Sequence, residues 1–201
     1  AKVTEVKGKE KILAYQPLNE KEKGEASQTH TVRFEKLLIA SGADPVKPDI
    51  PGINMEGVYT LRTIDDAEAI AQRAGKGKRA LLLGGGLVSL KAAYALHKLG
   101  LEITLVVASN RILSQMLDKE GAEIVAARLA ENGLVVYFQS DVTEIHGNGS
   151  GVKGVTLADG RELETDLVLV GKGVKPVTSF LEGSGLAVEN GIPTDEQLQT
   201  N

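Results

Sequence analysis

Six consecutive residues near the middle of the chain have the types and the spacing that suit a dinucleotide: Gly84, Gly85, Gly86, Leu87, Val88 and Ser89. They lie between an apolar run that predicts a strand and a pattern that predicts a helix. Gly84 permits a tight turn, and Gly86 lets the backbone approach a pyrophosphate without a Cβ in the way. The free N–H groups and positive dipole end of the helix then face the phosphates. Ser89 stands where a third glycine is usual and is small enough for close packing. Nucleotide binding is the favoured interpretation, and a glycine-rich turn that serves only packing is the alternative.

The end of the next predicted strand bears on the choice of nucleotide. An Asp or Glu usually stands there and binds the ribose hydroxyls of NAD. The residue in this chain is Val107, followed by Ala108-Ser109-Asn110-Arg111, so no carboxylate is present. Ser109 and Arg111 could hold a 2′-phosphate, which would favour NADPH. Alternatively, Arg111 is only a solvated surface side chain, and the sequence leaves NADH and NADPH open.

The elements that position these residues alternate regularly. Strands are expected at 79–83, 102–107 and 134–138, and helices at 87–99 and 119–131. Strand–helix–strand order predicts parallel βαβ units and therefore an α/β, Rossmann-like three-layer domain. Period-two alternation at 142–146, 152–157 and 162–164 then predicts an antiparallel β-meander, with turns at 147–149 and at 159–160. A further buried strand is expected at 166–170.

The N-terminal part has a different character. Short strands are expected at 12–16 and 30–34, and the charged run at 19–25 between them suits a solvated hairpin loop. The continuous apolar run at 37–40 predicts a strand that is buried on both faces. Prolines at 45, 48 and 51 then indicate an extended linker and a domain boundary. Thr63 suits the N-cap of a helix, because acidic residues follow it in the first turn.

Composition excludes several classes of function. The chain has 201 residues, a formal net charge of -4 and 3% aromatic residues, and its Lys and Arg are scattered, so neither nucleic acid nor a membrane surface is an expected partner. It has no Cys, and its three histidines lie far apart, so no metal site is expected. No apolar run approaches the roughly 20 residues of a membrane span, and no signal-peptide pattern is present. A cytoplasmic protein is expected.

Four further segments resemble motifs of the pyridine nucleotide-disulfide oxidoreductase family. The stretch at 37–45 is similar to its "A-T-G" segment, 50–52 to "I-P-G", 60–67 to "L-R-T…D-A", and 166–176 to "D-x-V-h-h-x-x-G-x-x-P". With the glycine pattern they occur in family order over nearly the whole chain. The likeness is greatest to the branch that holds NADH oxidases, rubredoxin and ferredoxin reductases, coenzyme A-disulfide reductases and the flavin subunit of NAD(P)H nitrite reductases.

The resemblance implies a longer parent enzyme that transfers hydride from NAD(P)H to FAD and on to an unknown acceptor. Residues 1–52 would be a partial FAD-domain segment, 53–174 the NAD(P)H-binding domain, and 175–201 the return segment toward the FAD domain. The fragment alone should be inactive, because its flavin site is incomplete. The parent would be a homodimer with a possible redox partner protein.

The resemblance also assigns positions near the cofactors. Ser41 and Gly42 would lie near FAD, the backbone at Val3 near its adenine, and Gly171 and Gly173 near the nicotinamide; packing is the alternative role for each. Two departures matter. Lys91 stands where the family usually has Glu on the first helix, and Val107 stands where an acid is usual. Lys91 could bind a phosphate of the cofactor or alter the hydride geometry, and a surface lysine without a role is the alternative. A degenerate Rossmann-type module, kept as a scaffold or interaction domain, is therefore the alternative function. No residue is assigned a catalytic role.

Overall fold

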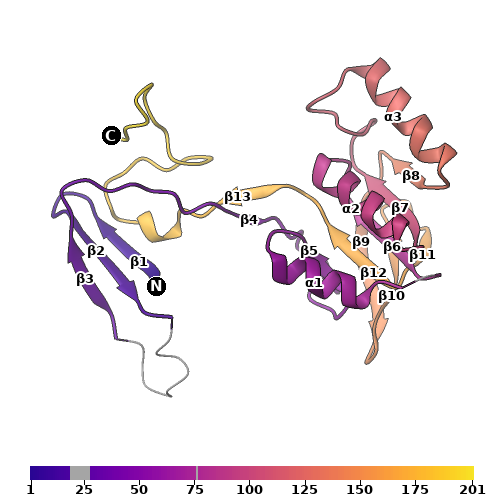
Figure 1. The fold of residues 1–201 in the computed structure, drawn as a ribbon, viewed down its shortest axis with the longest axis horizontal. Helices are drawn as coiled ribbons and strands as arrows, with labels where there is room; N and C mark the ends of the chain where they lie inside the picture. Colours follow the sequence, from indigo (N-terminus) through magenta and orange to yellow (C-terminus); the bar gives the residue numbers. More distant parts are fainter. Residues whose placement is uncertain (19–27, 76) are drawn as a thin grey trace. The chain divides into compact units, whose positions relative to one another are not determined.

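The computed structural model describes residues 1–18, 28–75 and 77–201 (Figure 1). The chain forms two compact units, one of Ala1–Asp44 with Lys175–Asn201 and the other of Pro45–Val174. The hairpin loop predicted at 19–25 lies outside the described residues. Within the described residues, no helix is both long enough and apolar enough to cross a membrane.

The first unit contains a three-stranded antiparallel sheet in the order β1-β2-β3. Its strands are β1 (Lys2–Lys7), β2 (Ile12–Gln16) and β3 (His30–Arg33), so the strands predicted at 12–16 and 30–34 are confirmed. Val6 and Ala14 are its buried strand residues, and Leu181 of the 3-10 helix Ser179–Leu181 is buried in the same unit. The Gly8 N–H donates to the Ser184 carbonyl (3.2 Å), which ties the C-terminal segment to β1.

The strand predicted at 37–40 is wrong. These residues have no regular secondary structure, and the side chain of Leu38 is 89% exposed. A strand needs a neighbour for its backbone groups, and none of the described strands pairs with this run. An apolar run alone therefore did not decide the structure here.

The second unit is built on a five-stranded sheet in the order β5-β12-β6-β7-β8, in which every neighbouring pair is parallel. Its strands are β5 (Val58–Thr60), β12 (Leu167–Val170), β6 (Arg79–Leu83), β7 (Glu102–Val107) and β8 (Val135–Phe138). The predicted strands at 79–83 and 102–107 are reproduced, and those at 134–138 and 166–170 begin one residue later. The three-residue strand β5 was not predicted.

Two layers cover this sheet, as predicted for a Rossmann-like α/β domain (Figure 1). Leu82, Leu105 and Leu169 face one side, where they pack with residues of the helices α1 (Ile64–Arg73), α2 (Leu87–Lys98) and α3 (Lys119–Glu131). Leu81, Val106 and other strand residues face the opposite side, where they pack with the meander strands. These strands are β9 (Val142–Asn148), β10 (Gly151–Leu157) and β11 (Glu162–Glu164). Alternate side chains of each central strand therefore supply two separate cores.

The turn predicted at 147–149 lies further along the chain. Strand β9 continues through Asn148, Gly147 pairs with Val152, and the turn falls at Gly149 and Ser150. The Asn148 Oδ1 accepts from the Ser150 N–H (2.9 Å), which is the local bond by which Asn favours a turn. The turn predicted at 159–160 is confirmed.

Helix α1 begins as predicted at the N-cap Thr63. Its hydroxyl accepts from the Asp66 N–H (3.2 Å), and the Asp66 carboxylate accepts from the N–H groups of Thr63 (2.9 Å) and Arg62 (2.8 Å). These backbone donors, Thr63 first, hold the pKa of Asp66 below its ordinary value against the opposing effect of burial. The capping box fixes the start of the helix that leads into β6.

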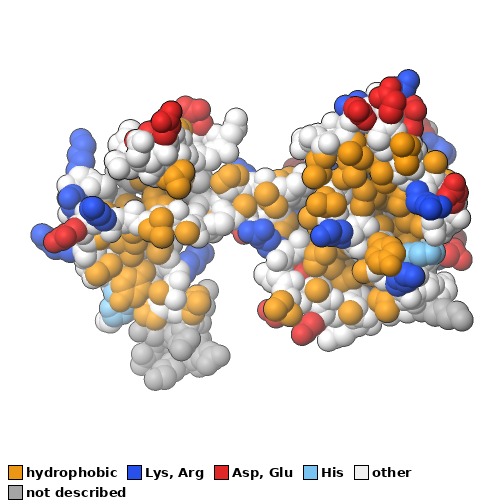
Figure 2. All heavy atoms as spheres, turned by 45° about the horizontal axis from the view of Figure 1, so that its top comes forward, with side chains coloured by type: hydrophobic (Ala, Val, Ile, Leu, Met, Phe, Trp, Pro, Cys, Tyr) orange, Lys and Arg blue, Asp and Glu red, His pale blue; other side chains and the backbone are white. Residues whose placement is uncertain are grey.

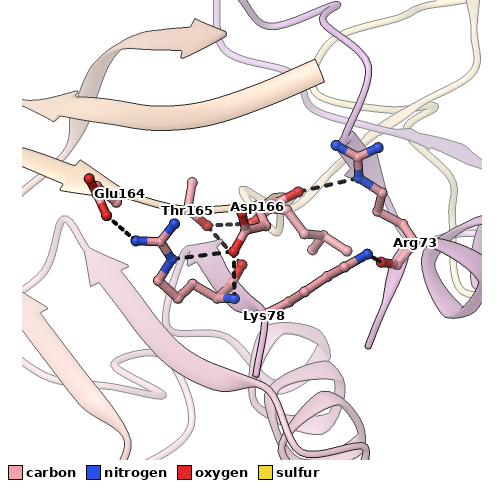
Figure 3. A network of polar contacts seen from close by, with 7 residues as sticks. Arg73, Lys78, Glu164, Thr165 and Asp166 are labelled. Atoms are coloured by element: carbon pink, nitrogen blue, oxygen red, sulfur yellow. Dashed lines mark hydrogen bonds and ion pairs between the residues drawn. The ribbon is translucent and has the colours of Figure 1, made fainter. Parts of the chain in front are cut away.

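An ionic network joins the amino ends of β6 and β12 (Figure 3). The Asp166 carboxylate accepts from the Arg79 N–H (3.0 Å) and from its Nε (3.3 Å), and Arg79 also pairs with Glu164. Burial raises the pKa of Asp166, but the hydrogen bonds from Arg79 outweigh burial and leave that pKa below its ordinary value. The carboxylate therefore stabilises the fold above its ordinary pKa, and this contribution is lost as pH falls through the lowered pKa.

Substitution Asp166→Asn should lower the free energy of unfolding at neutral pH by about 1–2 kcal/mol, because a charge-assisted pair with Arg79 is lost. The difference from the parent chain should shrink as pH falls below the ordinary carboxyl range. Urea unfolding at several pH values measures both effects. The control is Glu131→Gln, which removes an exposed pair with Arg128 and should change little. An Asp166→Asn deficit that stays constant down to acidic pH would contradict this account.

Candidate functional site

The predicted glycine turn lies at the carboxyl end of β6, where α2 begins. Gly86 is the N-cap of α2 in an extended conformation (φ -82°, ψ 173°), and no side chain caps the helix. The N–H groups of the first turn of a helix have no partner inside the helix. A Cβ added at Gly86 would meet no atom within 4 Å. The first turn of α2 is therefore approachable by a ligand, and the positive end of the helix dipole favours an anion there.

Gly84 and Gly171 occupy crowded positions beside this opening. Gly84 has φ +113°, and a Cβ there would lie 2.3 Å from the Gly171 carbonyl oxygen. A Cβ at Gly171 would lie 2.1 Å from Oγ of Ser89. The Ser89 hydroxyl is fully buried and has no hydrogen-bond partner among the described residues. Ser89 therefore stands where strand and helix approach closely, which requires a small residue.

A cavity of about 490 Å³ opens at this carboxyl edge of the sheet. Ten of the residues singled out from the sequence line this cavity: Gly84, Gly85, Gly86, Leu87, Val88, Ser89, Val107, Ser109, Gly171 and Gly173. Strands β6, β7 and β12 all end at this edge, because they run parallel in neighbouring positions. The carboxyl edge of a parallel sheet is the usual place for ligands in this architecture.

The loop after β7 forms another wall of the cavity. Val107 is 2% exposed, and a Cβ at Gly85 would lie 2.9 Å from its Cγ1, so these two residues are in tight contact. The Leu113 N–H donates to the Gly85 carbonyl (2.8 Å), which ties the loop to the glycine turn. Residues 113–116 also line the cavity and were not singled out from the sequence. These residues reach the cavity because β7 lies next to β6 in the sheet. The sequence pattern alone does not predict that order of strands.

Arg111 lies beside the cavity wall and is not one of its lining residues. The Ser109 hydroxyl donates to the Arg111 carbonyl (2.6 Å), and Nη2 of Arg111 donates to the Ser114 carbonyl (3.2 Å). Nε of Arg111 is buried and has no partner among the described residues. Ser109 and Ser114 both line the cavity. The guanidinium is therefore held against the loop and is not a freely solvated side chain.

Lys172 lines the cavity between Gly171 and Gly173 and was not singled out. Its Nζ contacts both carboxylate oxygens of Asp141, at 2.7 and 2.6 Å. No local sequence pattern indicates this pair, because the partners are 31 residues apart. Lys91, by contrast, is exposed on α2 outside the cavity, and no hydrogen bond or ion pair links its side chain to another described residue.

The other residues singled out belong to the first unit. Ser41 donates its hydroxyl proton to the Val177 carbonyl (2.6 Å), and the Gly42 carbonyl accepts from the Val177 N–H (3.0 Å). Gly42 has φ +72°, in the left-handed region that favours glycine. Val3 is half-buried in β1, opposite Tyr15. These contacts place the segment 41–42 beside the C-terminal return of the chain.

Charge on the molecular surface is mixed. On the face drawn in Figure 2, Lys and Arg side chains are scattered among acidic and hydrophobic ones and form no continuous patch. No group of three or more His, Cys, Asp or Glu among the described residues could hold a metal ion. The cavity at the carboxyl edge of the sheet is therefore the best-defined candidate site.

The family model described as pyridine nucleotide-disulphide oxidoreductase matches residues 1–201. The chain belongs to this family. It is 38% identical over 176 residues to the NADH-dependent phenylglyoxylate dehydrogenase subunit epsilon of Aromatoleum evansii, a match that covers 88% of this chain and 42% of that protein. It is 36% identical over 174 residues to the nitrite reductase [NAD(P)H] large subunit of Klebsiella oxytoca, a match that covers 86% of this chain and 18% of that protein.

Solved structures agree with this assignment. The NAD-dependent persulfide reductase from A. fulgidus superposes with a TM-score of 0.88 at 30% identity, over 98% of this chain and 36% of that one. The ferredoxin reductase for the CYP199A2 system from Rhodopseudomonas palustris superposes with a TM-score of 0.87 at 28% identity, over 98% of this chain and 46% of that one. The chain thus spans less than half the length of each of these relatives. The predicted family and the predicted α/β architecture are both confirmed.

Substitution Gly171→Ala should destabilise the chain by about 1–3 kcal/mol, because the new methyl group would overlap the Ser89 hydroxyl. Ser89→Ala alone should be neutral or slightly stabilising, since it removes a buried hydroxyl without a partner. In the double variant, part of the Gly171→Ala cost should disappear. Urea unfolding of the four proteins gives this double-mutant cycle.

The control is Gly149→Ala in the turn between β9 and β10, where a Cβ would meet nothing within 4 Å. Its stability should stay close to that of the parent. Full additivity of Gly171→Ala and Ser89→Ala would show that the two residues are not in the contact described.

Proposed function

We propose that this chain is the NAD(P)H-binding portion of a flavoprotein oxidoreductase that transfers hydride from NAD(P)H to FAD and on to an acceptor. Membership of the pyridine nucleotide-disulphide oxidoreductase family supports this activity. The names of two relatives, an NADH-dependent dehydrogenase subunit and an NAD(P)H nitrite reductase subunit, agree with it. The cofactors supply the redox chemistry when bound, and the protein supplies binding, orientation and exclusion of water.

One observation carries the proposal: the uncapped first turn of α2 faces open space over Gly86, beside a cavity at the carboxyl edge of a parallel sheet. A dinucleotide needs a site at which backbone N–H groups can approach its pyrophosphate. Gly84 and Gly85 would allow the tight turn, and Gly86 would leave space for the pyrophosphate to approach the backbone. Leu87, Val88 and Ser89 would contribute the N–H groups of the first helical turn.

The remaining assignments follow the family arrangement. We place the NAD(P)H-binding domain at 53–174 and pieces of an FAD domain at 1–52 and 175–201. Gly171 and Gly173 would lie near the nicotinamide, since they line the cavity at the end of β12. Ser41, Gly42 and Val3 would lie near FAD, and a redox partner protein would receive the electrons. Lys91 would stay outside the direct contacts, because it does not line the cavity.

Gly86→Leu should abolish binding of NADH and NADPH, because the added side chain would fill the space above the first turn of α2. Calorimetric titration of the chain measures the effect. The parent chain should bind at least one of the two nucleotides with a dissociation constant from micromolar to about millimolar, or roughly 4–8 kcal/mol.

Gly149→Leu is the matched control, because a Cβ there also meets nothing within 4 Å but lies in the β9–β10 turn. It should leave binding unchanged. Failure of the parent chain to bind either nucleotide up to millimolar concentration would favour the degenerate scaffold. Equal binding by the parent and by Gly86→Leu would remove the glycine turn from the site.

A further inference from the structure

We propose that Lys172 changes partner when a nucleotide binds: Asp141 holds its ammonium group in the free protein, and the anionic nucleotide holds it in the complex. Asp141 would then lower the affinity of the site, because it competes with the ligand for the same cation. The inference rests on the proposed function and concerns what sets the affinity of that site. Three observations support it: the charge of the cavity lining, the geometry of the ion pair, and the position of Lys172.

Lys172 carries the one charged side chain in the cavity lining. All other lining residues in the described part of the chain are apolar or uncharged. Asp141 is not a lining residue, although its carboxylate pairs with Nζ of Lys172. The pyrophosphate of NADH or NADPH is an anion, and a cation on the cavity wall attracts it. While Asp141 neutralises Lys172, most of that attraction is absent.

The ion pair is close, but water reaches it. Nζ of Lys172 contacts the two carboxylate oxygens of Asp141 at 2.7 and 2.6 Å, and the two side chains are 20% and 45% exposed. Ion pairs with access to water are weak, because water competes for both charges. The ammonium group lies at the end of a flexible four-carbon stem, so it can change partner by side-chain rotation. A second anion nearby can therefore compete with Asp141 for Lys172.

Asp141 has other hydrogen bonds besides those from Lys172. Its Oδ1 also accepts from the Val142 N–H (2.9 Å) at the start of β9. Its carbonyl accepts from the Ala158 N–H (2.8 Å), which holds the backbone in place. After release of Lys172 the carboxylate would keep its backbone donor and its contact with water. The exchange therefore leaves no buried charge without a partner, which would be the costly outcome.

Lys172 lies beside the proposed position of the pyrophosphate. It follows Gly171, where a Cβ would lie 2.1 Å from Oγ of Ser89 in the first turn of α2. The next residue is Gly173, so Lys172 provides the side chain of this three-residue stretch. A nucleotide bound at the first turn of α2 would bring its negative charge close to the cation that Asp141 holds.

This exchange and a purely structural ion pair predict different changes in binding. If Lys172 passes to the nucleotide, removing the charge of Asp141 frees the cation and tightens binding, whereas removing the charge of Lys172 weakens it. If the pair only holds the cavity wall in place, both changes break the same contact, and both should weaken binding. Opposite effects of the two substitutions are therefore the signature of the exchange.

The test is calorimetric titration of the full 201-residue chain and its variants with NADH, NADPH and ADP-ribose, which has the pyrophosphate but no nicotinamide. Asp141→Asn keeps an acceptor for the Val142 N–H and should tighten binding about two- to fivefold, the effect of one partly exposed ion pair. Lys172→Met should weaken binding about two- to fivefold. The double variant should bind like Lys172→Met, because no cation remains to be freed.

Asp159→Asn is the matched control. It makes the same change in net charge and releases Arg161 from its carboxylate partner, and neither of these two residues lines the cavity. Its affinity for each ligand should equal that of the parent chain. Thermal midpoints check that each variant folds.

Tighter binding by Asp141→Asn together with weaker binding by Lys172→Met supports the proposal. Unchanged or weaker binding by Asp141→Asn, or unchanged binding by Lys172→Met, overturns it and leaves the proposed function standing. Equal tightening by Asp159→Asn also overturns it, because net charge would then explain the effect. If the parent chain binds none of the three ligands, the proposed function is overturned as well.

Discussion

The site depends on the close approach of the first turn of α2 to the carboxyl ends of β6 and β12. Gly84, Ser89 and Gly171 meet at this point, and a Cβ on either glycine would come within 2.3 Å of a neighbouring oxygen. The Gly171 N–H donates to the Leu83 carbonyl (2.8 Å), so the two strands are paired up to their ends. Only small residues allow this approach. Because the turn is so tight, the first helical turn is exposed directly over the sheet edge.

The rest of the second unit holds this point in place. The Arg79–Asp166 ion pair joins β6 and β12 at their amino ends. Parallel pairing along the two strands then places Gly84 and Gly171 side by side at their carboxyl ends. Helices cover one face of the sheet and the meander the other, so the strands are buried on both sides. The loop after β7 is hydrogen-bonded to Gly85, so it forms part of the same edge of the sheet. A ligand therefore meets a wall that is formed before it arrives.

Sequence reasoning succeeded where a local pattern was complete. The strands at 79–83 and 102–107 and the helix at 119–131 agree with the structure. Apolar runs mark the two strands, and capping residues mark the ends of the helix. It failed at 37–40, where an apolar run has no strand beside it, and at β5, which is too short for a pattern. Contacts between distant residues were out of reach: Arg79 and Asp166 are 87 positions apart. The glycine turn was found from sequence, but the walls of its cavity required the order of the strands.

The central claim is that the first turn of α2 binds the pyrophosphate of a nicotinamide nucleotide. NMR titration of the uniformly ¹⁵N-labelled chain with NADPH tests it most directly, because each amide of the turn reports separately. The account predicts that the largest shift changes fall on the amides of Gly85, Gly86, Leu87 and Val88, with smaller changes in the loop at 108–116. Saturable changes confined to other parts of the chain, with the glycine turn unaffected, would contradict it.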